Sequence, residues 1–454
     1  MCIIGSGAGG AVLAAGLSER GLDVIMLEAG GHYTRDDFAP LDEHWAFKSL
    51  YQDCGGRATV DQAITVLQGR SVGGGTTVNW TTCFRTPDRI LRHWADVHGV
   101  EGQTTASLRP HFEAIEARLN IKPWPMDIAN ENNRKLLEGC KALGWEVSEL
   151  RRNVDSCANS GYCGLGCPVD AKQAMGVTFI PDAIAHGMRL YCDVRAERLV
   201  TEGDKIVAVE ARALNRETHK PTGATLEVRA RLTVVSGGAI NSPALLMRSG
   251  LGGEGPVGQR TFLHPVVTMA ARYPDTVEGF FGAPQSVGSH QFIDRGEGKV
   301  GFFLEVPPLQ PVLASGGIGV MGNKQLDFMR HLPYLGVLLS INVDGLVAGD
   351  EGGTVSLGEQ GHIRLDYPIT PPMVEAFRAG HEIMARIALA AGAEEVHSTH
   401  LPMVSVRSES ELSRLREAPY GSLEHGIFSA HQMGGCAMGP DPATSVVRSD
   451  LRHH

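Results

Sequence analysis

The sequence lacks the features that define several large protein classes. No uninterrupted apolar run is long enough to span a bilayer, and the N-terminus lacks the basic region of a signal peptide. Basic residues are not in excess: 41 Lys and Arg stand against 51 Asp and Glu, a formal charge of -10 that argues against a nucleic-acid binder. Nothing in the composition supports membrane association.

The sequence also lacks a disulfide pattern, internal repeats and low-complexity tracts. Its nine cysteines are an odd number and are scattered over 454 residues. Such usage fits a reducing compartment, so we expect a cytoplasmic protein.

The first residues of the sequence predict a strand, a glycine-rich turn and a helix. Apolar residues 1–4 lead into Gly5-Ser6-Gly7-Ala8-Gly9-Gly10 and an alanine-rich helix, and a second strand over 23–27 ends at Glu28. Gly5 permits a tight turn, Gly7 lets the backbone approach a pyrophosphate, and Gly10 lets the helix pack on the strand. Glu28 stands where an acidic side chain accepts hydrogen bonds from the adenosine ribose. The segment predicts a Rossmann-type site for FAD or NAD.

Two further glycine-rich segments are candidates for contact with a ligand. Residues 67–80 contain Gly73, Gly74 and Gly75 between apolar flanks, which indicates a ligand loop rather than a surface loop. Residues 236–252 predict a small-residue turn and a short helix that ends at Gly250, a second helix N-terminus able to face a cofactor.

Periodicity predicts a mixed fold. We expect helices over 89–121, 133–143 and 374–391, and strands over 188–194, 206–214 and 226–235. Residues 261–400 are short β-branched or aromatic segments broken by Gly and Pro, which favours an antiparallel sheet. The fold class is therefore α/β plus α+β, with a Rossmann-type domain interleaved with a substrate domain.

Four segments, in order along the chain, resemble the glucose/methanol/choline (GMC) family of FAD-dependent oxidoreductases. They are the opening turn with Glu28, the loop 69–80, the segment 236–252 and the segment His431-Gln432-Met433-Gly434-Gly435-Cys436-Ala437-Met438-Gly439. Cys163-Gly164-Leu165-Gly166-Cys167-Pro168 with Ala171-Lys172-Gln173 is similar to the branch of long-chain alcohol oxidases and related bacterial dehydrogenases.

The resemblance implies the site residues. FAD would be bound by Gly5, Gly7, Gly10 and Glu28, by Arg70, Gly73, Gly74 and Asn79 along the flavin, by Val194 at a strand end beside the adenine, and by Ser236, Gly237, Gly238 and Ala239 beneath the cofactor. Some relatives have a histidine at the position of Val78 that bonds covalently to the flavin. Valine cannot form that bond, so we expect noncovalent FAD.

The resemblance also assigns catalysis to His431. An imidazole, with a reference pKa near 6.5, can take the hydroxyl proton while a hydride leaves the carbinol carbon. The expected reaction is oxidation of an aliphatic or otherwise hydrophobic alcohol to an aldehyde or ketone, with oxygen, a quinone or a redox protein as electron acceptor. Two alternatives are an NAD(P)H-dependent flavin reductase, for which a second GxGxxG is missing, and a noncatalytic flavoprotein that acts as a binding subunit.

The resemblance divides the chain into interleaved domains. The FAD-binding domain would comprise 1–35, 186–260 and 401–454, the loops and helices that cover FAD 36–185, and the substrate domain 261–400. In the family a further segment follows the histidine motif and supplies a second His or Asn. We interpret the sequence, which stops at Leu451-Arg452-His453-His454, as an incomplete fragment; a divergent enzyme that recruits another residue is the alternative.

Two patterns leave alternatives open. Cys157, Ser160, Cys163 and Cys167-Pro168 match a ferredoxin spacing with one cysteine replaced, so we expect no metal but retain an iron–sulfur cluster as the alternative. Large apolar residues of the substrate domain form either its core or a lipophilic pocket, and Leu326 to Leu339 could be an apolar lid or a surface that rests on lipid. These residues are Phe280, Phe281, Phe302, Phe303, Leu304, Phe328, Leu332, Tyr334, Leu335, Leu338 and Leu339.

Overall fold

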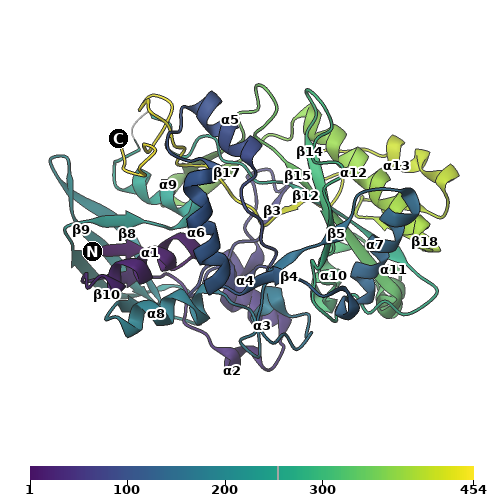
Figure 1. Ribbon diagram of the computed structural model, residues 1–454, viewed down its shortest axis with the longest axis horizontal. Coiled ribbons are helices and arrows are strands. Elements are labelled where there is room, and N and C mark those ends of the chain that lie inside the picture. The colour runs from purple at the N-terminus through teal and green to yellow at the C-terminus, as the bar shows by residue number, and fades with distance from the viewer. Residues whose placement is uncertain (253–254) are drawn as a thin grey trace.

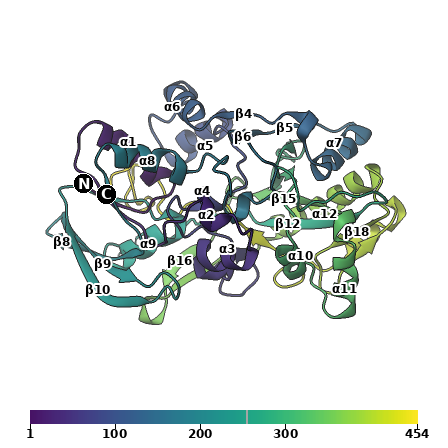
Figure 2. The same cartoon turned by 90° about the horizontal axis from the view of Figure 1, so that it is seen from below.

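The computed structural model describes residues 1–252 and 255–454. The molecule is elongated, with a smaller parallel sheet toward one end and a large antiparallel sheet toward the other (Figures 1 and 2). Both chain termini lie at the end that holds the parallel sheet. This arrangement confirms the predicted combination of a Rossmann-type unit with an antiparallel one.

The parallel sheet carries the glycine-rich turn. Its order is β11-β1-β2-β7, formed by Thr233–Val235, Cys2–Ile4, Ile25–Leu27 and Arg189–Tyr191. Three helices belong to this end of the molecule: α1 (Ala8–Glu19), α8 (Phe179–Ala185) and α9 (Gly238–Arg248). Buried apolar residues of β1 and α1 pack together, as the predicted strand–turn–helix requires.

A three-stranded antiparallel sheet lies beside it, in the order β10-β9-β8. Its strands are Pro221–Arg229, Lys205–Leu214 and Val194–Glu202. The predicted strand 188–194 is β7 followed by the start of β8, and the predicted strand 226–235 is the end of β10 followed by β11. Val194 therefore begins a strand, where the sequence had suggested an end.

The large sheet forms the other half. Its main order is β19-β18-β12-β15-β14-β13-β5, with bounds Ser405–Val406, Glu395–Ser398, Val266–Arg272, Leu335–Val343, Gly301–Glu305, Val287–Ser289 and Ser148–Glu149. Helices α12 (Pro371–Ala390) and α7 (Glu131–Leu143) pack against one another and against the sheet. Phe302 and Leu304 of β14 belong to the core that these helices cover, which leaves Phe303 and Glu305 to face the opposite side.

A short strand joins the halves. β20 (Phe428–Ser429) pairs with β12 through Phe428 and Val266, and with β3 (Thr65–Val66) through Phe428 and Thr65. Segments from the beginning, middle and end of the chain thus meet in one row. β19 and β20 pair with the large sheet, so a boundary after β20 between the substrate domain and the last FAD-binding segment matches the strand pairing better than the predicted boundary at 401. The domain boundaries stay a prediction.

Two predictions about segments were wrong. The predicted helix 89–121 is two helices, α5 (Asp88–His98) and α6 (Thr105–Arg118), because Gly99 ends α5 in the left-handed conformation, with φ of 64°. Leu326 to Leu339 is not an apolar lid. It comprises the end of α11 (Asn323–Arg330), a single turn and the first residues of β15, which are buried at the centre of the large sheet.

The remaining elements are short or peripheral. They are α2 (Arg35–Phe38), α3 (Glu43–Leu50), α4 (Gly75–Val78), α10 (Pro311–Gly317), α13 (Ser413–Glu417), β4 (Ile121–Pro123), β6 (Arg151–Asn153), β16 (Thr354–Leu357) and β17 (Ile363–Asp366). Across residues 1–252 and 255–454, no helix combines the length and apolar character needed to cross a membrane.

Candidate functional site

A cavity of about 1300 Å³ connects the two halves. Its wall begins at the turn between β1 and α1, passes the loop 68–82, and ends at Phe303, Glu305 and His431. Pockets for single drug-sized ligands are typically about 300 to 1,000 Å³. The volume therefore has room for a large cofactor together with a smaller molecule.

The glycine-rich turn has the geometry of a dinucleotide site. A Cβ on Gly5 would lie 2.5 Å from the backbone oxygen of Ser236, and one on Gly10 would lie 2.1 Å from the oxygen of Gly5. Both positions exclude a side chain for reasons internal to the protein. A Cβ on Gly7 would meet no atom within 4 Å, since Gly7 borders the cavity at the N-terminus of α1. That open approach to unpaired helix N–H groups fits a pyrophosphate.

Glu28 lies at the end of β2 and borders the cavity, as predicted. Its carboxylate accepts hydrogen bonds from the backbone N–H of Ser6 at 3.0 Å, from the hydroxyl of Ser6 at 2.6 Å and from the N–H of Gly30 at 2.8 Å. Burial raises the pKa of Glu28, and these hydrogen bonds oppose the rise. The carboxylate thus organises the turn in addition to facing the cavity.

The second glycine loop touches the first. A Cβ on Gly74 would lie 2.8 Å from the Cα of Gly7, and the N–H of Gly73 donates to the Ser6 hydroxyl at 3.0 Å. Gly74 borders the cavity but Gly73 does not, so Gly73 sets the conformation of the loop, with φ of 94°, rather than lying along a ligand. Arg70 borders the cavity and donates to the carbonyl of Ala29 at 2.9 Å.

A buried lysine supports the same loop from behind. Lys172 Nζ donates to the carbonyls of Thr77 at 2.5 Å, Cys163 at 2.6 Å and Asn79 at 3.1 Å. Burial lowers the pKa of Lys172 to about 8. The segment 163–172 therefore has a structural role: it fixes the carbonyls at the end of α4, whose next residue, Asn79, borders the cavity.

Most other predicted cofactor residues also border the cavity: Val194, Ser236, Gly237, Gly238 and Ala239. Val78 instead packs into an apolar cluster with Leu50, Tyr51 and Leu165. Sequence reasoning missed arginines that border the same end of the cavity, namely Arg57, Arg195 and Arg248. Their positive charge suits an anionic cofactor, but no motif marks them in the sequence.

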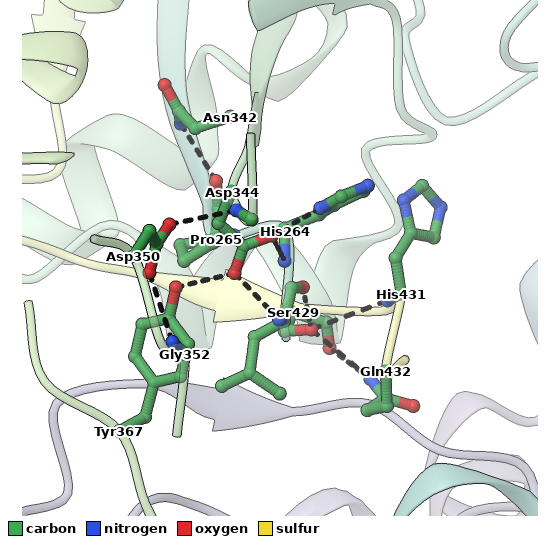
Figure 3. Close-up of polar contacts among 12 residues, drawn as sticks. His264, Pro265, Asn342, Asp344, Asp350, Gly352, Tyr367, Ser429, His431 and Gln432 are labelled. Atoms are coloured by element: carbon green, nitrogen blue, oxygen red, sulfur yellow. Dashed lines mark hydrogen bonds and ion pairs between the residues drawn. The ribbon is translucent and has the colours of Figure 1, made fainter. Parts of the chain in front are cut away.

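His431 follows β20 and borders the far end of the cavity. Its ring faces the open space and makes no hydrogen bond to any residue that the structure describes (Figure 3). The protein walls around the cavity partly desolvate His431 and lower its pKa to about 4, although the residue is exposed to the open space of the cavity; His264 lowers the pKa further and Asp344 opposes this. At neutral pH the imidazole is therefore uncharged and can accept a proton.

A second histidine, which sequence reasoning missed, lies beside it. The ring centroids of His264 and His431 are 6.1 Å apart in an edge-to-face arrangement, and His264 Nδ1 lies 2.5 Å from Asp344 Oδ1. Figure 3 shows the His264 ring extending from Asp344 toward His431. His264 has a φ of 46°, a left-handed conformation that is strained for a residue with a side chain.

The carboxylate of Asp344 holds this arrangement in place. It also accepts from the N–H of Leu263 at 2.9 Å and from the hydroxyl of Tyr367 at 2.5 Å. Burial would raise the pKa of Asp344, but the His264 and Tyr367 contacts hold it below its usual value. Because His264 and Asp344 are 80 residues apart in sequence, only the pairing of β12 with β15 brings them together.

The other sequence alternatives find little support in the geometry. No group of three or more His, Cys, Asp or Glu side chains within the described ranges is placed to hold a metal ion, and Cys157, Cys163 and Cys167 are free thiols. Of the large apolar residues proposed for a lipophilic pocket, only Phe303 borders the cavity. Phe302, Leu304 and Leu338 belong to the main core, and Phe328, Leu332 and Leu335 to a smaller cluster.

Comparisons with known proteins agree with this site. Two sequence profiles, both described as GMC oxidoreductase, match residues 47–266 and 350–454. A GMC-type oxidoreductase of Mycobacterium tuberculosis is 32% identical over 97% of this chain and 67% of its own length. The long-chain-alcohol oxidase FAO4A of Arabidopsis thaliana is 29% identical over 98% of this chain and 62% of its own length.

Solved structures share the fold. Pyridoxine 4-oxidase from Mesorbium loti has a TM-score of 0.70 at 20% identity, covering 100% of this chain and 91% of its own. A formate oxidase variant of Aspergillus oryzae has a TM-score of 0.70 at 15% identity, with the same coverage. The chain spans about two thirds of the length of the relatives named above, and the interpretation as a fragment stays a prediction.

Proposed function

Because the chain belongs to the GMC oxidoreductase family of FAD-binding flavoproteins, we propose that it oxidises the CH–OH group of an alcohol to an aldehyde or ketone, with His431 as the general base. The observation that carries the proposal is the single cavity that runs from the glycine-rich turn to the ring of His431.

The residues that line the cavity fit FAD, with one group placed for its adenosine and pyrophosphate portion and another for its flavin. Gly5, Gly7 and Glu28 would bind the adenosine and pyrophosphate portion, while Gly74 and Asn79 would lie along the flavin. FAD, when bound, supplies the acceptor for the hydride that leaves the carbinol carbon. We expect this FAD to be noncovalent, because Val78 offers no nucleophile and points into an apolar cluster.

His431 would take the proton. Alcohol oxidation removes a hydride from carbon and a proton from oxygen, and the proton needs an acceptor near the hydroxyl. The uncharged imidazole faces the cavity with no competing hydrogen bond. His264, oriented by Asp344, is a positioning residue whose ring lies edge-to-face with that of His431.

The test is anaerobic reduction of the bound flavin by alcohols, followed by stopped flow. His431→Ala should retain FAD but slow reduction about a hundredfold or more, the usual contribution of a positioned base. The difference in reduction rate between His431→Ala and the unsubstituted protein should become smaller as the pH rises, because hydroxide can then remove the hydroxyl proton in place of the histidine. In the unsubstituted protein the reduction rate should fall only toward a pKa of about 4, since burial lowers the pKa of His431 that far.

His111→Ala is the matched control, because His111 is exposed on α6. An unchanged reduction rate in His431→Ala would refute the role of the histidine. Reoxidation of the reduced protein by oxygen, compared with a quinone, separates an oxidase from a dehydrogenase.

A further inference from the structure

Glu305 is an acid buried in the wall of the cavity. It lies at the end of β14, two residues after Phe303, and both residues face the cavity. Only 1% of Glu305 is exposed. One carboxyl oxygen, Oε2, accepts a hydrogen bond from Gln285 Nε2 at 2.5 Å, while Oε1 is buried without a hydrogen-bond partner.

No cation compensates this carboxyl. Within residues 1–252 and 255–454, no Lys, Arg or His side chain forms an ion pair with Glu305, and only burial and the Thr82 hydroxyl influence its pKa. Burial raises the pKa of Glu305 to about 8, which the nearby Thr82 hydroxyl partly opposes. At neutral pH the group is thus a neutral carboxylic acid, and because Oε2 accepts from Gln285, its proton belongs on Oε1.

The neighbouring residues fix the orientation of the acid. Gln285 has a φ of 46°, a strained left-handed conformation, and its Oε1 accepts from the Thr82 hydroxyl at 3.0 Å. Thr82 and Gln285 border the same cavity. Strain of this kind persists where the surrounding structure imposes it and is concentrated at ligand sites. The three side chains therefore form a preorganised polar group with one free donor.

Glu305 and His431 line the same cavity and are linked through neighbouring strands of the large sheet. Phe303 pairs with Ile341, Ile341 with Val266, and Val266 with Phe428, three residues before His431. The wall near Glu305 is otherwise aromatic, formed by Phe303, Phe84 and Trp80. A bound molecule that reaches both His431 and Glu305 would meet apolar surface with one polar contact.

We propose that Glu305 is a substrate-specificity residue that donates a hydrogen bond from its carboxyl to a second oxygen of the alcohol, a hydroxyl, ether or carbonyl group remote from the carbon that is oxidised. The inference rests on the proposed function and refines its substrate class: an aliphatic or aromatic alcohol with a second oxygen function, rather than a plain hydrocarbon alcohol. A buried donor without an acceptor is costly, and such a substrate removes that cost.

A cationic amino alcohol is the competing substrate class. An ammonium group needs an ionised carboxylate as its partner, and burial of Glu305 without a counter-ion opposes that ionisation. Comparing diols with amino alcohols therefore tests the protonation state of Glu305 directly.

The experiment compares α,ω-diols with 1-alkanols and ω-amino-1-alkanols of the same chain lengths, using the flavin-loaded protein. For at least one chain length the diol should exceed the alkanol in kcat/KM by about tenfold, the ratio that corresponds to about 1.4 kcal/mol. Glu305→Leu should abolish this ratio of diol to alkanol kcat/KM. Glu305→Gln, whose amide still donates, should retain part of it.

Glu149→Gln is the matched control, because Glu149 lies exposed on β5 of the same sheet and outside the cavity. Binding of α,ω-dimethoxyalkanes, which carry no oxidisable hydroxyl, gives a readout independent of turnover. Calorimetry should show them binding more tightly to the unsubstituted protein than to Glu305→Leu.

The outcomes separate the two proposals. If neither diols nor alkanols reduce the flavin, the proposed function fails, and the ether titration still tests Glu305. Equal kcat/KM for diols and alkanols at every chain length, a ratio that survives Glu305→Leu, or a preference for amino alcohols would each overturn the assignment of Glu305.

Discussion

Acid should destabilise the half of the protein built on the large sheet, because three neutral histidines are buried against one another there. His381 lies on α12, His400 follows β18 and His425 precedes β20. Their ring centroids are 5.2 to 5.5 Å apart, and none of the three is more than 3% exposed. Each Nε2 lacks a hydrogen-bond partner, as does the hydroxyl of Tyr420 beside them.

The expected size of the effect follows from the pKa values. Burial lowers the pKa of His400 and of His425 to about 4, and that of His381 well below its usual value. Histidines in an unfolded chain bind protons near pH 6.5. The stabilisation is therefore complete above that pH and is lost as the pH falls toward 4. Below pH 6.5 each histidine lowers the stability by about 1.4 kcal/mol per pH unit, so all three lower it by about 4 kcal/mol per pH unit. Total stabilities are about 5 to 15 kcal/mol, so a fall of one pH unit removes a large part of them.

Urea unfolding at a series of pH values between 7.5 and 5 measures the loss. His425→Phe keeps an aromatic ring against His381 and Tyr420 but binds no proton, so the slope of stability against pH should fall by about a third. His111→Gln on the surface should leave the slope unchanged. An identical slope in His425→Phe and the unsubstituted protein would refute the reasoning.

Two further predictions concern the cofactor. Glu28→Ala should weaken FAD retention about tenfold or more, because the ribose and the turn at Ser6 both lose a charged acceptor worth about 1.5 to 3 kcal/mol. Ultrafiltration measures the flavin that stays bound, with Glu227→Ala on the exposed strand β10 as the control. Stoichiometric flavin in Glu28→Ala after dilution would contradict the ribose assignment. Acid precipitation should release all flavin absorbance into the supernatant, since Val78 cannot form a covalent bond; colour that stays in the pellet would exclude noncovalent binding.

The sequence was sufficient to predict those elements whose contacts lie mainly between residues close together in the chain. The strand, turn and helix around Gly5, Gly7 and Gly10 lie within 30 residues, and Gly10 packs on Gly5 within this segment, although Gly5 is also constrained by the distant Ser236. The long amphipathic α12 was predicted within three residues at its start and one at its end for the same reason. β8 was missed because a register shift between Ala196 and Arg198 breaks its alternation, so that the buried Ala196 and Leu199 lie three residues apart.

The other side chains of the candidate site near His431 are brought together by pairing between distant segments. His264 and Asp344 have no motif, and their contact requires the register of β12 against β15. Glu305 follows Phe302-Phe303-Leu304, a run that reads as core, and nothing in its spacing shows that it turns to the cavity. The sequence thus indicated more of the residues that line the glycine-rich end of the cavity than of those that line the His431 end.

The row of residues through β3, β12 and β20 has a consequence for biosynthesis. Thr65, Val266 and Phe428 must all be synthesised before this row can form, and His431 follows three residues later. The parallel sheet similarly needs Thr233–Val235 to pair with Cys2–Ile4. Contacts so distant in sequence form slowly. The parallel sheet can form once residue 235 has left the ribosomal exit tunnel, whereas the row through β3, β12 and β20 must wait for residue 428. The part of the cavity wall that carries His431 is therefore completed after the glycine-rich end.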